Sequence, residues 1–237
     1  MTPSRVLRGA GVAVLAAVAT SAQTLDPRTA SGQLAVCGGS AWQRVGFLEF
    51  EVSVQGPTRT EGPWHYRWDR GYGFFRLSGP GPDGQPLDVA VDIGSGTGGG
   101  WSSGTQLTGP PLEKAVKWSQ RRFKEDVMWV TFPLEWGAAG VTVTPLPDAV
   151  GEDGVVLRAT EVRSAVGRWV VTLDAETGRI VRTVLERKGA GTLTVDWWDW
   201  QQHGGVYFAQ KRAIRETGET ILVKIVRAQA SPPADAF

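Results

Sequence analysis

The sequence is poor in the residues that build disulfides and metal centres. Its 237 residues include one cysteine, two histidines and two methionines. A single cysteine cannot form an intramolecular disulfide or a cysteine-rich zinc site. Two histidines would need carboxylates to complete a metal site, and the available set of Asp196, Asp199 and His203 is thin. We therefore expect neither a metal ion nor another cofactor.

The sequence also lacks an excess of charge and a long apolar run. It has 25 basic and 24 acidic residues, a formal net charge of +1. No strong field of one sign exists to attract a nucleic acid, so we expect no nucleic-acid partner. No apolar run reaches the roughly 18 residues that suggest a permanent membrane span. The hydrophobic content of 41% is enough for a folded core, and we expect a monomer.

The first 22 residues have the pattern of a secretory signal peptide. Arg5 and Arg8 precede the apolar stretch Gly9–Ala19, and small residues end the segment at Ala22. This order of basic, apolar and small residues is typical of an export signal. We expect an exported protein, periplasmic or alternatively secreted, whose residues 23–237 form a single domain.

Glycine and tryptophan are plentiful, with 31 and 11 residues, and much of the chain alternates between apolar and polar residues. Leu48, Phe50 and Val52, for example, alternate with Glu49 and Glu51, which is the period of a half-buried strand. The strands predicted in this way are 47–54, 64–69, 87–93, 155–163, 168–174, 179–187, 192–201, 206–215 and 220–227. Their close spacing and short connections predict a mainly β fold, a curved antiparallel sheet that forms an unclosed half-barrel.

Helical periodicity interrupts the strands over residues 110–130. Apolar residues recur there at three- and four-residue steps, Pro110 and Pro111 suit a helix start, and Pro133 marks its end. An amphipathic helix inserted into a series of strands needs an apolar surface to cover. We therefore expect segment 110–130 to be a lid over the concave face of the sheet, and a short helical segment, interrupted at Gly38 and Gly39, before the first strand.

The glycine-rich stretch matches two sequence motifs that are found in enzymes. Gly94–Gly99 fits the dinucleotide fingerprint, but no helix can open directly after it, so we expect a simple loop. Gly100–Gly104 fits the nucleophile elbow of serine hydrolases, with Ser102 as nucleophile and His203 as base. The chain lacks the alternating strands and helices of that fold. A hydrolase using Ser102 and His203 thus remains only an alternative.

Other residue patterns leave two further alternatives. Glu49 and Glu51 have the strand spacing of a carboxylate pair, although a solvated strand face explains them better. Rows of exposed tryptophan would suit a carbohydrate-binding module. The same tryptophans could instead form a core, or line a cavity for an apolar ligand.

The order of these elements resembles the LolA/LolB-like superfamily, which contains lipoprotein carriers and outer-membrane lipoprotein-sorting proteins. The resemblance covers nearly all of residues 23–237 through short motifs. The residues that carry it are Gly38–Trp42, Trp68–Arg70, Phe75 and Arg76, Gly96 and Trp101, Asp174–Ile180 and Trp198–Trp200.

The resemblance implies an unclosed antiparallel barrel with a helical lid over an apolar cavity, and non-catalytic binding of an acyl chain, a lipoprotein anchor or a similar amphiphile. It also implies a lipid or an acylated protein as ligand, and a membrane-associated delivery partner. Carriers of this family hold the lid with an arginine that precedes a proline. Arg70 is the nearest match here, but Gly71 follows it. The expected cavity or lid residues are Trp64, Trp68, Arg70, Phe75, Trp101, Trp118, Phe123, Trp129 and Trp198.

Overall fold

The computed structural model describes residues 25–150, 154–187 and 191–237. The predicted signal peptide, residues 1–22, lies outside these ranges. Within them, no helix combines the length and apolar character needed to cross a membrane. The helices are α1 (Ala30–Val36), α2 (Ser40–Arg44), α3 (Gly109–Thr131) and the 3-10 turn η1 (Phe132–Leu134). The strands are β1 (Phe47–Gln55), β2 (Thr60–Asp69), β3 (Phe74–Pro80), β4 (Pro86–Asp92), β5 (Gly98–Ser102), β6 (Thr105–Gln106), β7 (Thr142–Val150), β8 (Val156–Ser164), β9 (Gly167–Asp174), β10 (Ile180–Arg187), β11 (Gly191–His203), β12 (Val206–Ile214) and β13 (Glu219–Gln229).

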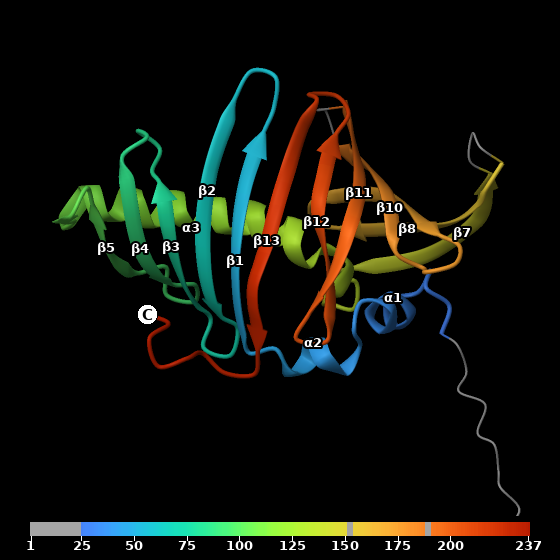
Figure 1. The fold of residues 1–237 in the computed structure, drawn as a ribbon, viewed down its shortest axis with the longest axis horizontal. Helices are drawn as coiled ribbons and strands as arrows, with labels where there is room; N and C mark the ends of the chain where they lie inside the picture. The colour runs from blue at the N-terminus through green and yellow to red at the C-terminus, as the bar shows by residue number, and fades with distance from the viewer. Residues whose placement is uncertain (1–24, 151–153, 188–190) are drawn as a thin grey trace, which may run out of the picture.

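All these strands belong to one antiparallel sheet, in the order β6-β5-β4-β3-β2-β1-β13-β12-β11-β10-β9-β8-β7. The sheet consists of two runs of consecutive strands joined where β1 pairs with β13, so the first and the last strand lie side by side in the middle of the sheet (Figure 1). Its two outer strands, β6 and β7, do not pair with each other. The predicted mainly β, unclosed architecture is confirmed.

Alternation of apolar and polar residues accounts for most of these strands. In β1 the side chains of Phe50, Val52 and Val54 are buried on the concave side, and Glu51 alternates with them. The edge strand β7 carries Pro145, a residue that the outermost strand of a sheet tolerates because one row of its N–H groups needs no partner. Prolines and glycines break the apolar alternation in β5 and β7, which the sequence pattern did not predict. Strand β3 and the two-residue β6 were also absent from the predicted strands.

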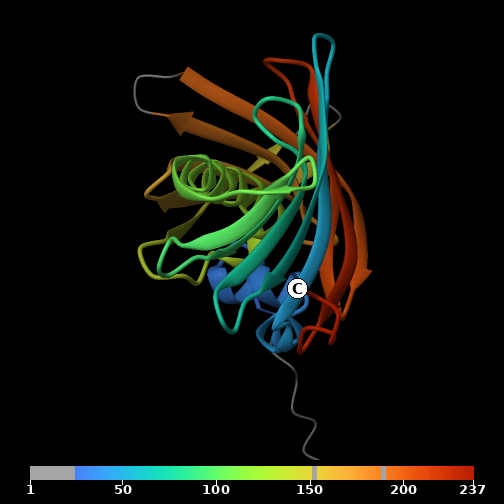
Figure 2. The same cartoon turned by 90° about the vertical axis from the view of Figure 1, so that its left-hand side faces the viewer.

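Helix α3 lies across the concave face of the sheet, which curves around it (Figure 2). Pro110 and Pro111 occupy its first turn, and η1, which contains Pro133, follows its end. The helix buries Ala115, Val116 and Phe123 toward the sheet. Its bounds confirm the helix predicted over 110–130 and its position as a cover.

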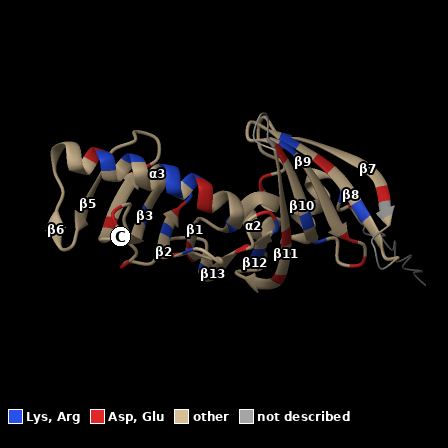
Figure 3. Cartoon of the chain, turned by 90° about the horizontal axis from the view of Figure 1, so that it is seen from above, with Lys and Arg blue, Asp and Glu red and all other residues tan. Residues whose placement is uncertain are grey.

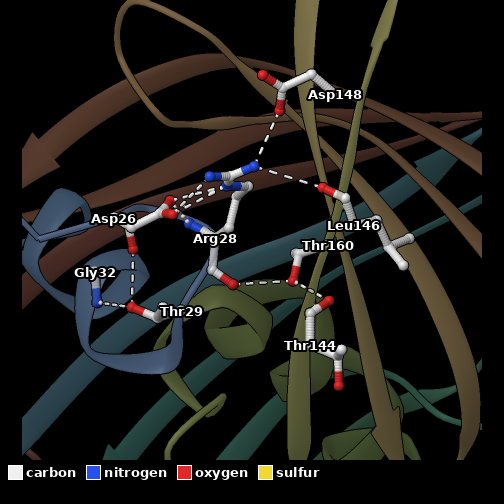
Figure 4. Close-up of polar contacts among 8 residues, drawn as sticks. All are labelled: Asp26, Arg28, Thr29, Gly32, Thr144, Leu146, Asp148 and Thr160. Atoms are coloured by element: carbon white, nitrogen blue, oxygen red, sulfur yellow. Dashed lines mark hydrogen bonds and ion pairs between the residues drawn. The ribbon is translucent and has the colours of Figure 1, made fainter.

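Polar contacts hold the N-terminal segment against the far end of the sheet (Figure 4). The Arg28 guanidinium binds the carboxylates of Asp26 at 2.8 Å and Asp148 at 3.1 Å. The hydroxyl of Thr160 on β8 lies 2.9 Å from the carbonyl oxygen of Arg28 and 3.0 Å from that of Thr144 on β7. These bonds connect residues 26–29 to β7 and β8. Helix α1 follows and lies below the sheet in the view of Figure 1.

The predicted helical opening is present as α1 and α2, separated by Gly38 and Gly39. The Thr29 side chain caps α1 by accepting a hydrogen bond from the Gly32 backbone N–H at 3.1 Å. Cys37 is fully buried after α1, and this burial raises the pKa of its thiol to about 12. The thiol is therefore protonated at neutral pH.

Candidate functional site

An apolar pocket of about 500 Å³ lies at the C-terminal end of α3. The end of the helix and η1 form one wall, and β8, β9 and the end of β2 form the others. Its lining residues are Trp68, Arg70, Val127, Met128, Thr131, Phe132, Glu135, Trp136, Val141, Val162, Ser164, Val166 and Trp169. The volume falls within the range of small-molecule sites, and the lining is predominantly aromatic and aliphatic, as in sites for apolar ligands.

Two charged residues, Arg70 and Glu135, lie among these apolar walls. The guanidinium of Arg70 lies 3.5 Å from the centre of the Trp42 ring and donates hydrogen bonds to the backbone oxygens of Trp42 and Val45. Desolvation lowers the pKa of Arg70, while nearby Glu135 opposes that shift. Arg70 thus connects the end of β2 to α2 and bounds the pocket on that side.

A buried ion pair fastens the middle of α3 to the sheet. Asp126 accepts two hydrogen bonds of 2.8 Å from the Arg122 guanidinium, one turn earlier. The hydroxyl of Tyr66 on β2 donates to the same carboxylate at 2.5 Å. Burial raises the pKa of Asp126, and Arg122 opposes that shift. The Arg122 guanidinium also lies 3.7 Å from the centre of the Trp64 ring, which extends the contact to the start of β2.

Stacked aromatic rings reinforce this attachment. The Phe123 ring of α3 lies parallel to Phe75 of β3, with 4.2 Å between their centres. It also meets Trp68 edge-on at 5.4 Å and Tyr66 at 5.8 Å. The centre of α3 is therefore fixed, and the pocket opens beyond this cluster, at the end of the helix.

The nine residues predicted for the cavity or lid lie in several places. Trp68 and Arg70 line the pocket. Phe75 and Phe123 are stacked in the core beneath α3, and Trp64 is buried beside Arg122. The remaining four are Trp118 and Trp129, half-buried on α3, and Trp101 and Trp198, exposed on β5 and β11.

A backbone irregularity in β11 puts Trp200 on the same side as Trp197 and opposite to Trp198. The Trp198 side chain is 39% exposed, whereas its neighbour Trp197 is buried beneath α3, with its ring centre 6.1 Å from that of Trp129. Asp199 has a φ of 57°, the left-handed conformation that interrupts strand alternation. Trp197 and Trp200 consequently stack on the same side at 6.5 Å, although they are three residues apart. Trp198 does not line the pocket.

Several residues that form the pocket were not among the predicted ones. Trp136, Trp169 and Phe132 pack against one another, with ring centres 4.7 Å apart for Phe132 and Trp169 and 6.0 Å for Phe132 and Trp136. The alternating pattern of β9 predicts that the Trp169 side chain is buried. It does not predict which element this side chain faces. Trp136 follows η1 in a segment without a repeating pattern, so no pattern predicted that its side chain is buried.

Arg212 is a further residue that the sequence pattern did not single out. It lies on β12 with 0% exposure, opposite Trp197 of β11. None of its three guanidinium nitrogens has a hydrogen-bond partner among the residues that the structure describes. Its guanidinium lies 4.6 Å from the centre of the Trp197 ring. Such a cation–π contact contributes about 2 kcal/mol of stabilisation. This is less than the several kcal/mol that the desolvation of an ion costs.

The serine-hydrolase alternative is wrong. Ser102 ends β5 and His203 ends β11, and strands β4, β3, β2, β1, β13 and β12 lie between them in the sheet. Seven strand spacings of about 4.8 Å place the two residues roughly 30 Å apart along the sheet. The glycine-rich segment Gly94–Gly99 leads from β4 into β5 and not into a helix, so the dinucleotide-binding geometry does not form.

The acidic residues that had been considered as metal ligands form ion pairs with basic side chains. Asp196 binds Arg182 and Arg215, and Asp199 binds Lys211. In the described part of the chain, no three histidine, cysteine or acidic side chains form a group that could hold a metal ion.

The carboxylate of Glu49 is buried, contrary to the solvated face expected for it. It contacts His65 at 2.9 Å and Arg67 and Arg227 at 3.3 Å each. Glu51 is paired instead with Lys224. Glu49 and Glu51 thus serve separate ion pairs on the outer face of the sheet.

The exposed row of tryptophans that the carbohydrate-binding alternative requires is not formed by the described residues. Within the described chain, the exposed tryptophans are Trp101 on β5 and Trp198 on β11. Six strands separate them, so they cannot make a shared flat surface.

Comparisons with solved structures returned distant matches. A putative outer-membrane lipoprotein-sorting protein domain from Vibrio parahaemolyticus is 13% identical, with a TM-score of 0.43, and the match covers 87% of this chain and 96% of that one. A LolA superfamily protein from Nitrosomonas europaea is 10% identical, with a TM-score of 0.45 and coverages of 84% and 96%. The Pseudomonas aeruginosa MucA/MucB complex gives 12% identity and a TM-score of 0.25, covering 87% and 59%. No family model and no curated protein matches the chain.

In this chain an open antiparallel sheet curves around one long helix. This is the architecture that the sequence resemblance implied. The ligand is inferred from the pocket.

Proposed function

We propose that this chain is an exported, non-catalytic binding protein that holds an acyl chain, a lipoprotein anchor or a similar amphiphile in the pocket at the end of α3. The observation that carries the proposal is the pocket itself, about 500 Å³ in volume and lined mainly by apolar side chains. Each methylene group removed from water contributes about 0.8 kcal/mol, so an acyl chain binds there with few polar contacts.

The position of the pocket supports reversible binding. The Arg122–Asp126 pair and the Phe123–Phe75 stack hold the centre of α3. The pocket lies past that fixed part, between η1 and β9, and opens to solvent at the end of the helix. A chain-like ligand can enter at this end without detaching the whole of α3. The partner that delivers or receives the ligand would approach from the same side, in the periplasm or outside the cell.

A substitution that fills the pocket tests this proposal. Val127 lines the pocket from α3 and is half-buried, so the larger ring in Val127→Trp extends into open volume. We expect the affinity for a fluorescent fatty acid, measured by titration, to fall at least about tenfold. The thermal midpoint should change little, because the added ring occupies the volume of the pocket.

The matched control is Lys124→Trp, which adds the same ring to an exposed position of α3 outside the pocket. Its affinity should stay within about twofold of the unmodified chain. Equal affinities for Val127→Trp and the unmodified protein would show that the ligand binds elsewhere.

A further inference from the structure

Arg212 lies inside the domain, on the face of β12 that α3 covers. In the sheet it is opposite Trp197 of β11 on one side and Ile221 of β13 on the other, both of them buried. Its neighbour Lys211 points to the outer face, where its ammonium group binds Asp199. The two adjacent cations of β12 thus occupy opposite environments, one solvated and paired, the other enclosed.

Two acidic residues of the elements around Arg212, one on α3 and one on β11, are bound to other side chains (acidic residues are red in Figure 3). On α3, Asp126 is held by Arg122 and Tyr66. On β11, Asp196 binds Arg182 and Arg215. Burial alone lowers the pKa of Arg212, to about 9, which leaves its guanidinium charged at neutral pH. Within the described chain the charge therefore has neither a hydrogen-bond acceptor nor a counter-ion.

An enclosed cation without a partner disfavours folding, and such a group calls for a specific explanation. A guanidinium presents a planar fork of donors that matches the two oxygens of a carboxylate or a phosphate. An apolar side chain of similar volume would pack in this position without the desolvation cost. The chemistry of Arg212 therefore fits an anion that reaches the interior of the domain.

The ring of Trp197 connects Arg212 to the pocket. Its centre lies 4.6 Å from the Arg212 guanidinium and 5.9 Å from the centre of the Phe132 ring. Phe132 belongs to the pocket wall. One layer of aromatic rings thus separates the guanidinium from the space in which the acyl chain is proposed to bind.

We propose that Arg212 binds the anionic head of the ligand, a carboxylate or phosphate carried on an acyl chain. This inference rests on the proposed function and narrows it to anionic amphiphiles. The head enters the pocket first and moves the rings of Phe132 and Trp197 apart. It then accepts hydrogen bonds from the guanidinium, while the chain fills the apolar pocket behind it.

The experiment compares three ligands of equal chain length, a saturated fatty acid, the corresponding alcohol and the corresponding alkyl phosphate. Each competes with a fluorescent acyl probe on the purified protein, below the concentration at which it forms micelles. The variants are Arg212→Met and Arg212→Lys, with Lys211→Met as the control that removes one cation from the outer face of the same strand. Inorganic phosphate serves as the anion without a chain.

We expect the unmodified protein to prefer the acid or the phosphate over the alcohol by at least about tenfold. Arg212→Met should lose that preference while binding the alcohol as before, and its thermal midpoint should rise because a buried charge is gone. Arg212→Lys keeps the charge without the planar fork and should show a reduced preference. Lys211→Met should retain the full preference.

Failure of this inference differs from failure of the proposed function. Equal binding of acid and alcohol by the unmodified protein would overturn the role of Arg212 and leave the pocket proposal standing. The role of Arg212 would also be overturned if both Arg212 variants kept the same preference for the acid or the phosphate over the alcohol. If none of the three ligands binds the unmodified protein, the proposed function itself fails. Competition by inorganic phosphate as strong as that of the alkyl phosphate would show an anion site unrelated to acyl chains.

Discussion

Replacing Asp126 by alanine should lower the free energy of unfolding by about 3 kcal/mol, because breaking a buried ion pair leaves its partner charge without compensation. The carboxylate of Asp126 satisfies both the Arg122 guanidinium and the Tyr66 hydroxyl. After its removal, the nearest acid to Arg122 is Glu61, at 4.0 Å. Urea denaturation followed by circular dichroism measures the loss, which corresponds to a thermal midpoint lower by roughly 6–12 °C for a domain of this size.

Glu125→Ala is the matched control, since it removes one carboxylate from the adjacent, exposed position of α3. We expect it to change stability by no more than about 0.5 kcal/mol. A double-mutant cycle between Asp126→Ala and Tyr66→Phe should give a coupling energy of about 1 kcal/mol or more. A loss below about 1 kcal/mol for Asp126→Ala would mean that the ion pair does not fasten the helix.

Replacing Phe123 by alanine should destabilise the protein by about 3–5 kcal/mol, the usual cost of deleting a buried aromatic ring. The ring contacts Phe75, Trp68 and Tyr66 on two neighbouring strands. Its loss leaves a void between α3 and the sheet that a smaller side chain cannot fill. Denaturant unfolding, with tryptophan fluorescence as the signal, measures the change.

The control for this prediction is Tyr72→Ala, which deletes an aromatic ring that is 88% exposed. It should alter stability by no more than about 0.5 kcal/mol. If Phe123→Ala is equally mild, the helix does not depend on this stack, and α3 would be held mainly by its ion pair.

Alternation predicted the fold well wherever one face of a strand meets the core and the other meets solvent. It identified β1 through Phe50 and Val52, and helical periodicity identified α3, because both patterns depend on local spacing. It missed β5, whose residues Gly98–Gly100 have no side chains to alternate, and β7, which contains Pro145 and Pro147. These strands are recognised through their pairing with β4 and β8, which sequence spacing cannot reveal.

The site was less predictable because it depends on contacts between distant segments. Trp68 and Arg70, two of the residues expected at the cavity or lid, line the pocket, whereas Trp136 and Trp169 come together only where η1 packs on β9. The left-handed Asp199 puts Trp200 on the side of Trp197, whereas strand alternation would put it on the side of Trp198. Arg212 occupies an inward position of β12 that the alternation of that strand assigns to an apolar side chain.

Native mass spectrometry of the purified protein tests the central claim most directly. After incubation with a fatty acid, the account predicts a one-to-one complex in the unmodified chain and in Lys124→Trp. Extraction with organic solvent should remove the ligand, and Val127→Trp should not form the complex. The account would be contradicted if the unmodified chain formed no complex, or if Val127→Trp retained the ligand as fully as the unmodified chain.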